Sequence, residues 1–270
     1  MMPPTNRLKM LAAGAFMIFA ACHLTIANAA DVYYSTEGTL NFEGEIRRGD
    51  AERVVVAALT APTLIYEINI NSNGGDLAEA MRIVSLVKDA HWNIEVMGHG
   101  RVCVSACFFI FIAGERRSAG GTDGIAWPQE FWSIEPGVVG VHRPYLKDPL
   151  ENPESPKNQE ALMRKAREYL NEAGIAQYLV DEMMSRPSND IYWLKRRDLE
   201  FVGTFSPGIE EALIANCGYK RSAQAVAERR NKETETQVNF CVAKFLGDRN
   251  FRIQKLYVAK LRSGWRPWKK

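Results

Sequence analysis

The stretch GRVCVSACFFIFIAG, residues 100–114, decides how this chain folds. After Ser105 comes an almost unbroken apolar run that ends at Gly114. The run predicts a buried helix, because such a helix has no face for water and because glycine commonly closes a helix. Ser105 stands in the first turn of that helix, with Cys103 and Cys107 on either side. A serine at this place is an N-cap, a packing residue or a nucleophile.

Strand and helix patterns alternate on both sides of this stretch, and that order predicts parallel strand pairing in an α/β fold. The apolar helix spacing over 76–90 begins at Asp76, a typical N-cap. Residues 71–75, 115–136 and 143–157 are expected to be loops. Strands are predicted at 38–46, 64–70, 93–98 and 137–142, and helices after Gly49-Asp50 and at 76–90, 105–114, 157–174 and 175–186.

The N-terminus has the pattern of an export signal. Arg7 and Lys9 precede a short apolar run and then the small-residue sequence ANAAD. This pattern predicts a signal peptide over residues 1–29, cut between Ala29 and Ala30. Two alternatives remain open, an uncut membrane anchor and a lipoprotein acylated at Cys22. All three place the rest of the protein outside the cytoplasm, in the periplasm or secreted.

Charge is unevenly distributed along the chain. Residues 1–29 carry two basic and no acidic side chains, so the 34 Lys/Arg and 32 Asp/Glu of the whole chain leave 32 of each after cleavage. Residues 221–270 hold 13 Lys/Arg against 4 Asp/Glu. This basic tail suggests docking within or between subunits, or contact with an anionic membrane surface, although a solvated charged helix explains it equally well. Nucleic-acid binding is not expected in an exported chain whose basic segment lacks interleaved aromatic residues.

Two strand-to-helix turns carry possible chemistry. Gly74 and Gly75 follow a predicted strand and leave backbone N–H groups open to a ligand oxygen, although most Gly-Gly turns are only structural. Ser105 repeats this placement about thirty residues later, where a helix N-terminus favours developing negative charge.

Four phrases together resemble a known family. INSNGGDLAEAMRIVSLV, VSACFFIFIAGERR, VGVHRP and SNDIYWL occur in the order seen in the proteolytic subunit of the Clp protease, and more closely in exported ClpP-like relatives of the ClpP/crotonase superfamily. The resemblance covers residues 38–208. It implies a spiral of ββα units with a protruding helical handle at 157–186. It also implies that Ser105 is the nucleophile, His142 the general base and Asp190 the carboxylate that orients His142, with Gly74 and the Ala106 N–H in the oxyanion hole.

The sequence departs from that family in three places. The loop before VGVH is longer and carries Trp127, Phe131 and Trp132. Residues 213–270 have no counterpart in the family and are predicted to be a basic, mainly helical extension after a catalytic domain at 30–212. The export signal argues against an obligate cytoplasmic ATPase partner.

Other residues could fill the same roles. His99 is the rival base, whereas His91 at a helix C-terminus is expected to interact with the helix dipole or solvent. Asp181 and Asp198 compete with Asp190, and Asp190 itself could simply form a turn after Pro187-Ser188-Asn189.

The cysteines have competing explanations. His99, Cys103 and Cys107 have metal-ligand spacing, but a strand-to-helix junction separates them and no fourth ligand is evident, so no metal is expected. A cysteine nucleophile is disfavoured because export oxidises exposed thiols. The even number of cysteines left after cleavage suggests a Cys217–Cys241 disulfide and a Cys103–Cys107 pair that is either bonded or packed as buried thiols.

These observations predict an exported serine peptidase that needs no cofactor, acts on peptide or protein substrates and forms a homo-oligomer. The alternatives are a catalytically silent scaffold with the same fold and a crotonase-like enzyme that hydrolyses or transfers acyl groups from thioesters.

Overall fold

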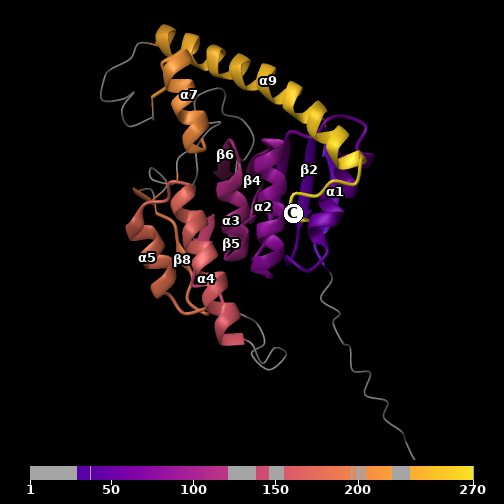
Figure 1. Ribbon diagram of the computed structural model, residues 1–270. Helices are drawn as coiled ribbons and strands as arrows, with labels where there is room; N and C mark the ends of the chain where they lie inside the picture. The colour runs from indigo at the N-terminus through magenta and orange to yellow at the C-terminus, as the bar shows by residue number, and fades with distance from the viewer. Residues whose placement is uncertain are drawn as a thin grey trace, which may run out of the picture.

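The computed structural model describes residues 29–36, 38–120, 138–145, 155–195, 197–198, 202, 205–220 and 232–269 of the 270. These residues form a mixed α/β structure in which helices flank a central sheet (Figure 1). The predicted signal peptide, Cys22 and the loop with Trp127, Phe131 and Trp132 lie outside the described residues. No helix in the described ranges is long and apolar enough to cross a membrane.

The larger sheet has five strands in the order β1-β2-β3-β4-β6. β1 pairs with β2 antiparallel, and the other neighbours pair in parallel. Parallel neighbours need a crossover, and helices α1, α2 and α3 supply these connections. The strands are β1 Asp31–Thr36, β2 Thr39–Glu43, β3 Glu67–Asn71, β4 Asn93–Met97 and β6 Arg117–Gly120.

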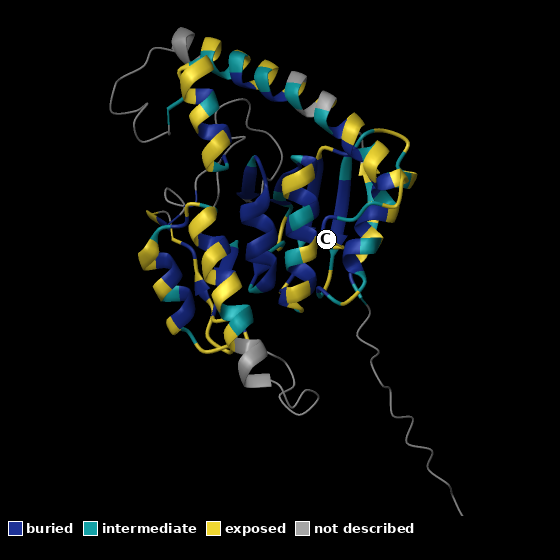
Figure 2. Cartoon of the chain, viewed as in Figure 1, coloured by how far each residue is buried: buried dark blue, intermediate teal, exposed yellow. Residues whose placement is uncertain are grey.

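The core lies on the helix side of this sheet. Alternate residues of each parallel strand, such as Leu40, Ile68 and Ile94, are 1% exposed or less. They pack in one cluster with the buried faces of the covering helices, which are dark blue in Figure 2. All eight residues of α3 are buried, as the apolar run predicts. These helices are α1 Asp50–Thr60, α2 Leu77–Ala90 and α3 Ala106–Ala113.

A second sheet of three strands carries the candidate site. β5 (Cys103–Val104) pairs in parallel with β7 (Val139–Val141), which pairs antiparallel with β8 (Tyr192–Trp193). Helices α4 (Ser155–Glu172) and α5 (Gln177–Ser185) lie beside this sheet at one end of the molecule (Figure 1). Residues Leu170, Leu179 and Met183 of these helices are buried in the main core.

The C-terminal segment packs back onto the body. Helix α7 (Pro207–Cys217) leads to α9 (Lys232–Arg262), which runs from α7 to α1 across the edge of the molecule (Figure 1). Near its start, α9 shares a small core with α7 that includes Leu213, Val242 and Leu246. Near its end, Tyr257 and Leu261 join the main core. The predicted boundary between residues 212 and 213 falls inside α7.

The start of the described chain is also tied down. Ala30, directly before β1, is 2% exposed and belongs to the main core. Its carbonyl accepts a hydrogen bond from Arg53 Nη1 at 3.2 Å. β1 therefore begins packed against the body.

Most predicted elements are confirmed within a few residues, but several short strands, β8 among them, were not predicted. Asp76 caps α2 and accepts a hydrogen bond from the Glu79 N–H, as predicted. β1 was not predicted, and residues 117–120 form β6 where a loop was expected. The loop prediction was wrong because β6 pairs with β4 through its backbone and contains the buried Arg117, so it shows no apolar pattern.

Candidate active site

Ser105 sits in an uncommon backbone conformation between β5 and α3. Its φ is 59° and its ψ is −122°, and His91 is the only other non-glycine residue in the described ranges with a positive φ. Such a conformation costs about 1–3 kcal/mol and persists only where surrounding structure imposes it. The Ser105 side chain makes no capping hydrogen bond to α3. The hydroxyl is therefore not used as an N-cap.

Backbone contacts from two neighbouring segments hold this turn in place. The Ser105 N–H donates to the Gly140 carbonyl at 3.0 Å, and the Val104 N–H donates to the Ser72 carbonyl at 2.9 Å. Gly74, with φ 94°, lies so close that a Cβ there would come within 2.7 Å of Ser105 Cβ and of the Val104 oxygen. Only glycine fits at position 74, so the Gly-Gly turn and the serine turn pack directly against each other.

His142 lies at the end of the strand next to Ser105. It follows β7, whose Gly140 pairs with Val104, so both residues lie at the carboxyl ends of neighbouring parallel strands. His142 is 6% exposed. Its Nδ1 lies 3.0 Å from the Arg143 carbonyl oxygen. A carbonyl only accepts, so Nδ1 carries the proton and Nε2 is left as the acceptor nitrogen.

Asp190 lies at the same end of the second sheet as His142, but its side chain is paired with Arg186. β8 runs antiparallel to β7, with Val141 opposite Tyr192, which brings Asp190 to the same end of the sheet as His142. The Asp190 side chain is half exposed and accepts a hydrogen bond from Arg186 Nη1 at 2.7 Å. Among the described residues, no hydrogen bond joins Ser105 to His142 or His142 to Asp190.

The rival carboxylate, Asp198, is fully buried and occupied. It accepts hydrogen bonds from the hydroxyls of Tyr178 and Tyr192 at 2.9 Å and from the Lys195 N–H at 2.7 Å. Burial alone would raise the pKa of Asp198, but these hydrogen bonds outweigh burial and hold the pKa below its usual range. Burial, and then the hydrogen bond to Asp198, raise the pKa of Tyr178 to about 12. Asp198 thus connects β8 to α5, and three hydrogen bonds already engage its carboxylate.

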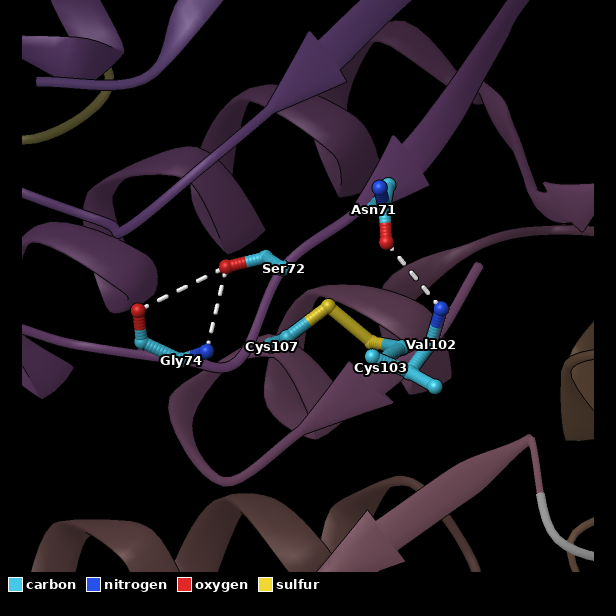
Figure 3. Close-up of a disulfide and its surroundings, with 6 residues drawn as sticks. All are labelled: Asn71, Ser72, Gly74, Val102, Cys103 and Cys107. Carbon is cyan, nitrogen blue, oxygen red and sulfur yellow. Dashed lines mark hydrogen bonds between the residues drawn. A yellow bond between two sulfur atoms is a disulfide. The ribbon is translucent and has the colours of Figure 1, made fainter. Parts of the chain in front are cut away.

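The backbone donors near Ser105 differ in availability. The Gly74 N–H donates to Ser72 Oγ at 3.1 Å, and the same hydroxyl lies 3.4 Å from the Gly74 carbonyl oxygen (Figure 3). Gly75 bridges Ile46 in parallel through the Gly74 carbonyl and the Asp76 N–H, which turns the Gly75 N–H away from Ile46. Ala106 is the first residue of α3, and its N–H therefore has no partner within the helix.

The rival histidines lie elsewhere. His99 is exposed in the turn after β4. His91 ends α2 in the left-handed conformation, and its Nδ1 contacts the buried Glu115. No group of three or more His, Cys, Asp or Glu side chains in the described part of the chain is arranged to hold a metal ion.

Both cysteine pairs are bonded. Cys217 and Cys241 join the end of α7 to α9, with Cα atoms 5.6 Å apart. Cys103 and Cys107 are joined across the Ser105 turn, with Cα atoms 5.2 Å apart (Figure 3). The suggestion that Cys103 and Cys107 are buried free thiols is therefore wrong, because the two sulfur atoms are bonded to each other.

Sequence reasoning missed three contributors to the site. Ser72 contacts Gly74, Gly140 accepts from Ser105, and the Arg143 carbonyl faces His142. Backbone contacts leave no signal in residue type. Gly140 is the one contributor whose residue type is constrained. A Cβ at this position would come within 2.6 Å of Ile191 on the adjoining segment.

No protein-family model matches the sequence, and neither does any curated protein sequence. Solved structures similar to this chain include ClpP1 from Listeria monocytogenes, at 22% identity and TM-score 0.40, and a mutant of it, at 20% and 0.43. Each comparison covers 62% of this chain and 88% of the ClpP1 chain. A mutant of the membrane-bound stomatin-specific protease 1510-N is similar at 15% identity and TM-score 0.42, over 69% of this chain and 88% of that chain. The structural neighbours of this chain are thus ClpP and a stomatin-specific protease, at low sequence identity.

Proposed function

We propose that the protein is an exported serine peptidase in which Ser105 attacks a peptide carbonyl. The observation that carries this proposal is the backbone of Ser105, which is strained, uncapped and set at the start of a buried helix. A serine that only caps a helix adopts an extended backbone and uses its hydroxyl on the helix. Ser105 does neither, so its hydroxyl is free for chemistry.

The base in this proposal is His142. With its Nδ1 proton on the Arg143 carbonyl, Nε2 can take the Ser105 proton as the serine oxygen bonds to the substrate carbon. The same nitrogen then returns the proton to the leaving amine, and water resolves the acyl-enzyme by the reverse sequence.

Two backbone N–H groups would stabilise the oxyanion of the tetrahedral intermediate. Ala106 supplies one, at the positive end of α3. Gly74 can supply the other only by releasing Ser72 Oγ, whereas Gly75 makes no hydrogen bond through its N–H to another described residue. We therefore favour Gly75 as the second donor and assign Gly74 the role of making room for Ser105.

Asp190 completes the proposed triad as the orienting carboxylate. To do so it has to leave Arg186, with which it is ion-paired in this structure, and take the place of the Arg143 carbonyl at His142 Nδ1. The resemblance of the four sequence phrases to the ClpP-like family supports peptide substrates, a spiral ββα core with a handle at 157–186, and assembly into a homo-oligomer. The two disulfides are compatible with export.

A catalytically silent scaffold is the second candidate. The pairing of Asp190 with Arg186 and the lack of a hydrogen bond between Ser105 and His142 within the described residues favour it. A fluorophosphonate probe separates the two functions, because it labels only an activated serine.

We expect labelling at Ser105 that rises with pH through the range in which an imidazole loses its proton. Ser105→Ala should abolish labelling, and His142→Ala should lower it by about 10²-fold or more, whereas His99→Ala should leave most of it. No labelling of the wild type by any probe would support the scaffold. Thioester turnover without peptide turnover would instead indicate a crotonase-like enzyme.

A further inference from the structure

The disulfide between Cys103 and Cys107 encloses the serine turn. Cys103 is in β5, Cys107 is in the first turn of α3, and Ser105 lies midway between them. Both cysteines are 0% exposed. The bond, shown in Figure 3, therefore lies inside the core and joins the two residues that stand two positions before and two positions after Ser105.

The backbone of Ser105 has to be held by its surroundings. On the strand side, hydrogen bonds fix Val104 and Ser105 to the neighbouring strand ends. On the helix side, the Ser105 carbonyl accepts from the Phe108 N–H at 3.0 Å, a contact within the first turn of α3. The disulfide adds a second covalent link, besides the backbone itself, between the two sides of the turn.

The two disulfides differ in what they can do for overall stability. A disulfide restricts the unfolded chain more when it closes a longer loop. Cys217 and Cys241 are separated by 24 positions, and Cys103 and Cys107 by only 4. The short loop gives Cys103–Cys107 the smaller general effect, so its main consequence is local, at Ser105.

We propose that the Cys103–Cys107 disulfide positions Ser105 for reaction, so that the serine becomes an effective nucleophile only after this pair has been oxidised. This inference rests on the proposed serine hydrolase function and adds its regulation. A chain still in a reducing compartment has a serine turn without its covalent brace. Oxidation after export then switches the site on, and burial of both sulfur atoms keeps the bond from being reduced again.

The oxidation step requires a disulfide reagent R–S–S–R. One cysteine thiolate attacks a sulfur of the reagent and releases one thiol, which leaves a mixed disulfide on the protein. The second thiolate attacks that protein sulfur and releases the second thiol. The protein loses two electrons and two protons, and the reagent takes them up as two R–SH.

The test compares two double variants of the full chain. Cys103→Ala/Cys107→Ala removes the brace, and Cys217→Ala/Cys241→Ala is the matched control that removes the longer-loop disulfide. Fluorophosphonate kinetics are resolved into the inactivation rate constant and the reversible binding constant, with circular dichroism to verify that each variant is folded.

We expect the inactivation rate constant to fall about tenfold or more in Cys103→Ala/Cys107→Ala, because a small displacement of a nucleophile is costly, while the binding constant stays within about twofold. The control should keep its rate constant and lose more thermal stability. Equal rate constants in the two variants would overturn the inference, whereas absence of labelling in the wild type would overturn the proposed function instead.

A second measurement covers the case in which the alanine variant does not fold. The wild-type chain is reduced while unfolded and then refolded with oxidised glutathione, because the reagent reaches these sulfur atoms only before the core has closed over them, and peptide mapping follows the closure of each disulfide. Labelling should rise in step with Cys103–Cys107. A rise that follows Cys217–Cys241, or full labelling before either bond closes, would contradict the inference.

Discussion

Gly74 and Ser105 pack so closely that any side chain at position 74 would displace Ser105. Ser105 Cβ and the Val104 carbonyl oxygen occupy the space that a Cβ of residue 74 would need. Gly74 and Ser105 both have a positive φ. The sequence could predict the two turns themselves, because strand-to-helix junctions rich in small residues leave a visible pattern. It could not predict the φ of Ser105 or the carbonyl partner of His142, because those depend on backbone contacts between distant segments.

The first prediction concerns Gly74→Ala. The added methyl would come within 2.7 Å of the Val104 carbonyl oxygen and of Ser105 Cβ, in a backbone conformation that alanine disfavours. We therefore expect the free energy of unfolding to fall by about 1–3 kcal/mol. The rate of labelling at Ser105 should fall as well, and by more than this loss of folded protein explains. Gly247→Ala is the control, because nothing lies within 4 Å of that position in α9 and alanine favours a helix by about 1 kcal/mol. Urea unfolding and probe labelling measure both effects. Unchanged labelling in Gly74→Ala would remove the two-turn arrangement from the mechanism.

The second prediction concerns Asp190→Asn. If Asp190 engages His142 during turnover, this change should lower the labelling rate by about 10-fold or more, because it removes the charge that orients and stabilises the imidazolium. Arg186→Gln frees Asp190 from its ion pair and should preserve or raise the rate. A rate unaffected by Asp190→Asn would mean that the Arg143 carbonyl alone orients the imidazole.

At the scale of elements, the sequence was informative where an apolar pattern and a cap occur together. α2 has both and was predicted almost to the residue. β6 has neither, because its buried Arg117 donates to the carbonyls of Gly114 and Val202, a contact between segments 85 positions apart. For α9, the sequence showed only an excess of basic residues, which left open what the helix packs against. In the structure Arg249 of α9 reaches Glu115, as the charge imbalance suggested for docking within the chain.

The third prediction concerns this contact between α9 and the body. Glu115 has a side chain only 6% exposed, and both His91 and Arg249 contact its Oε1. Arg249→Gln removes one charged donor and leaves a buried carboxylate with less compensation, so we expect a loss of about 1–3 kcal/mol. Lys255→Gln on the exposed face of α9 is the control and should change stability by less than about 0.5 kcal/mol. Hydrogen exchange should also accelerate in the C-terminal half of α9, and unaltered exchange would show that Arg249 does not hold the helix.

At the scale of the whole molecule, the large sheet has one apolar face and one polar face. The polar face gathers two carboxylates, Glu67 and Glu95, around Arg116, whose Nη2 contacts them at 2.5 Å and 2.8 Å. Burial, and then repulsion from Glu95, raise the pKa of Glu67 to about 7 against the attraction of Arg116. One guanidinium is thus shared by two acids, and Glu67 is the one that retains its proton at mildly acidic pH.

The fourth prediction is a pH dependence of unfolding. A carboxyl whose pKa is higher in the folded than in the unfolded chain binds more protons when folded, so its contribution to stability is present at low pH and is lost as pH rises through about 7. We expect this group to lower the free energy of unfolding between pH 5 and pH 8 by on the order of 1–3 kcal/mol. Glu67→Gln, which stays neutral, should flatten that part of the curve. A variant with the same slope as the wild type would assign the effect to other groups.

The buried position of Ala30 sets an order of events for a chain that is cut after Ala29. A processing peptidase needs several residues on both sides of the cut in an extended, accessible form. Ala30 is in the core and β1 begins at the next residue, so the folded body hides the downstream side of the cut. Cleavage at the predicted site would therefore have to precede the pairing of β1 with β2, and removal of the leader would be a step on the folding pathway rather than an event that follows it.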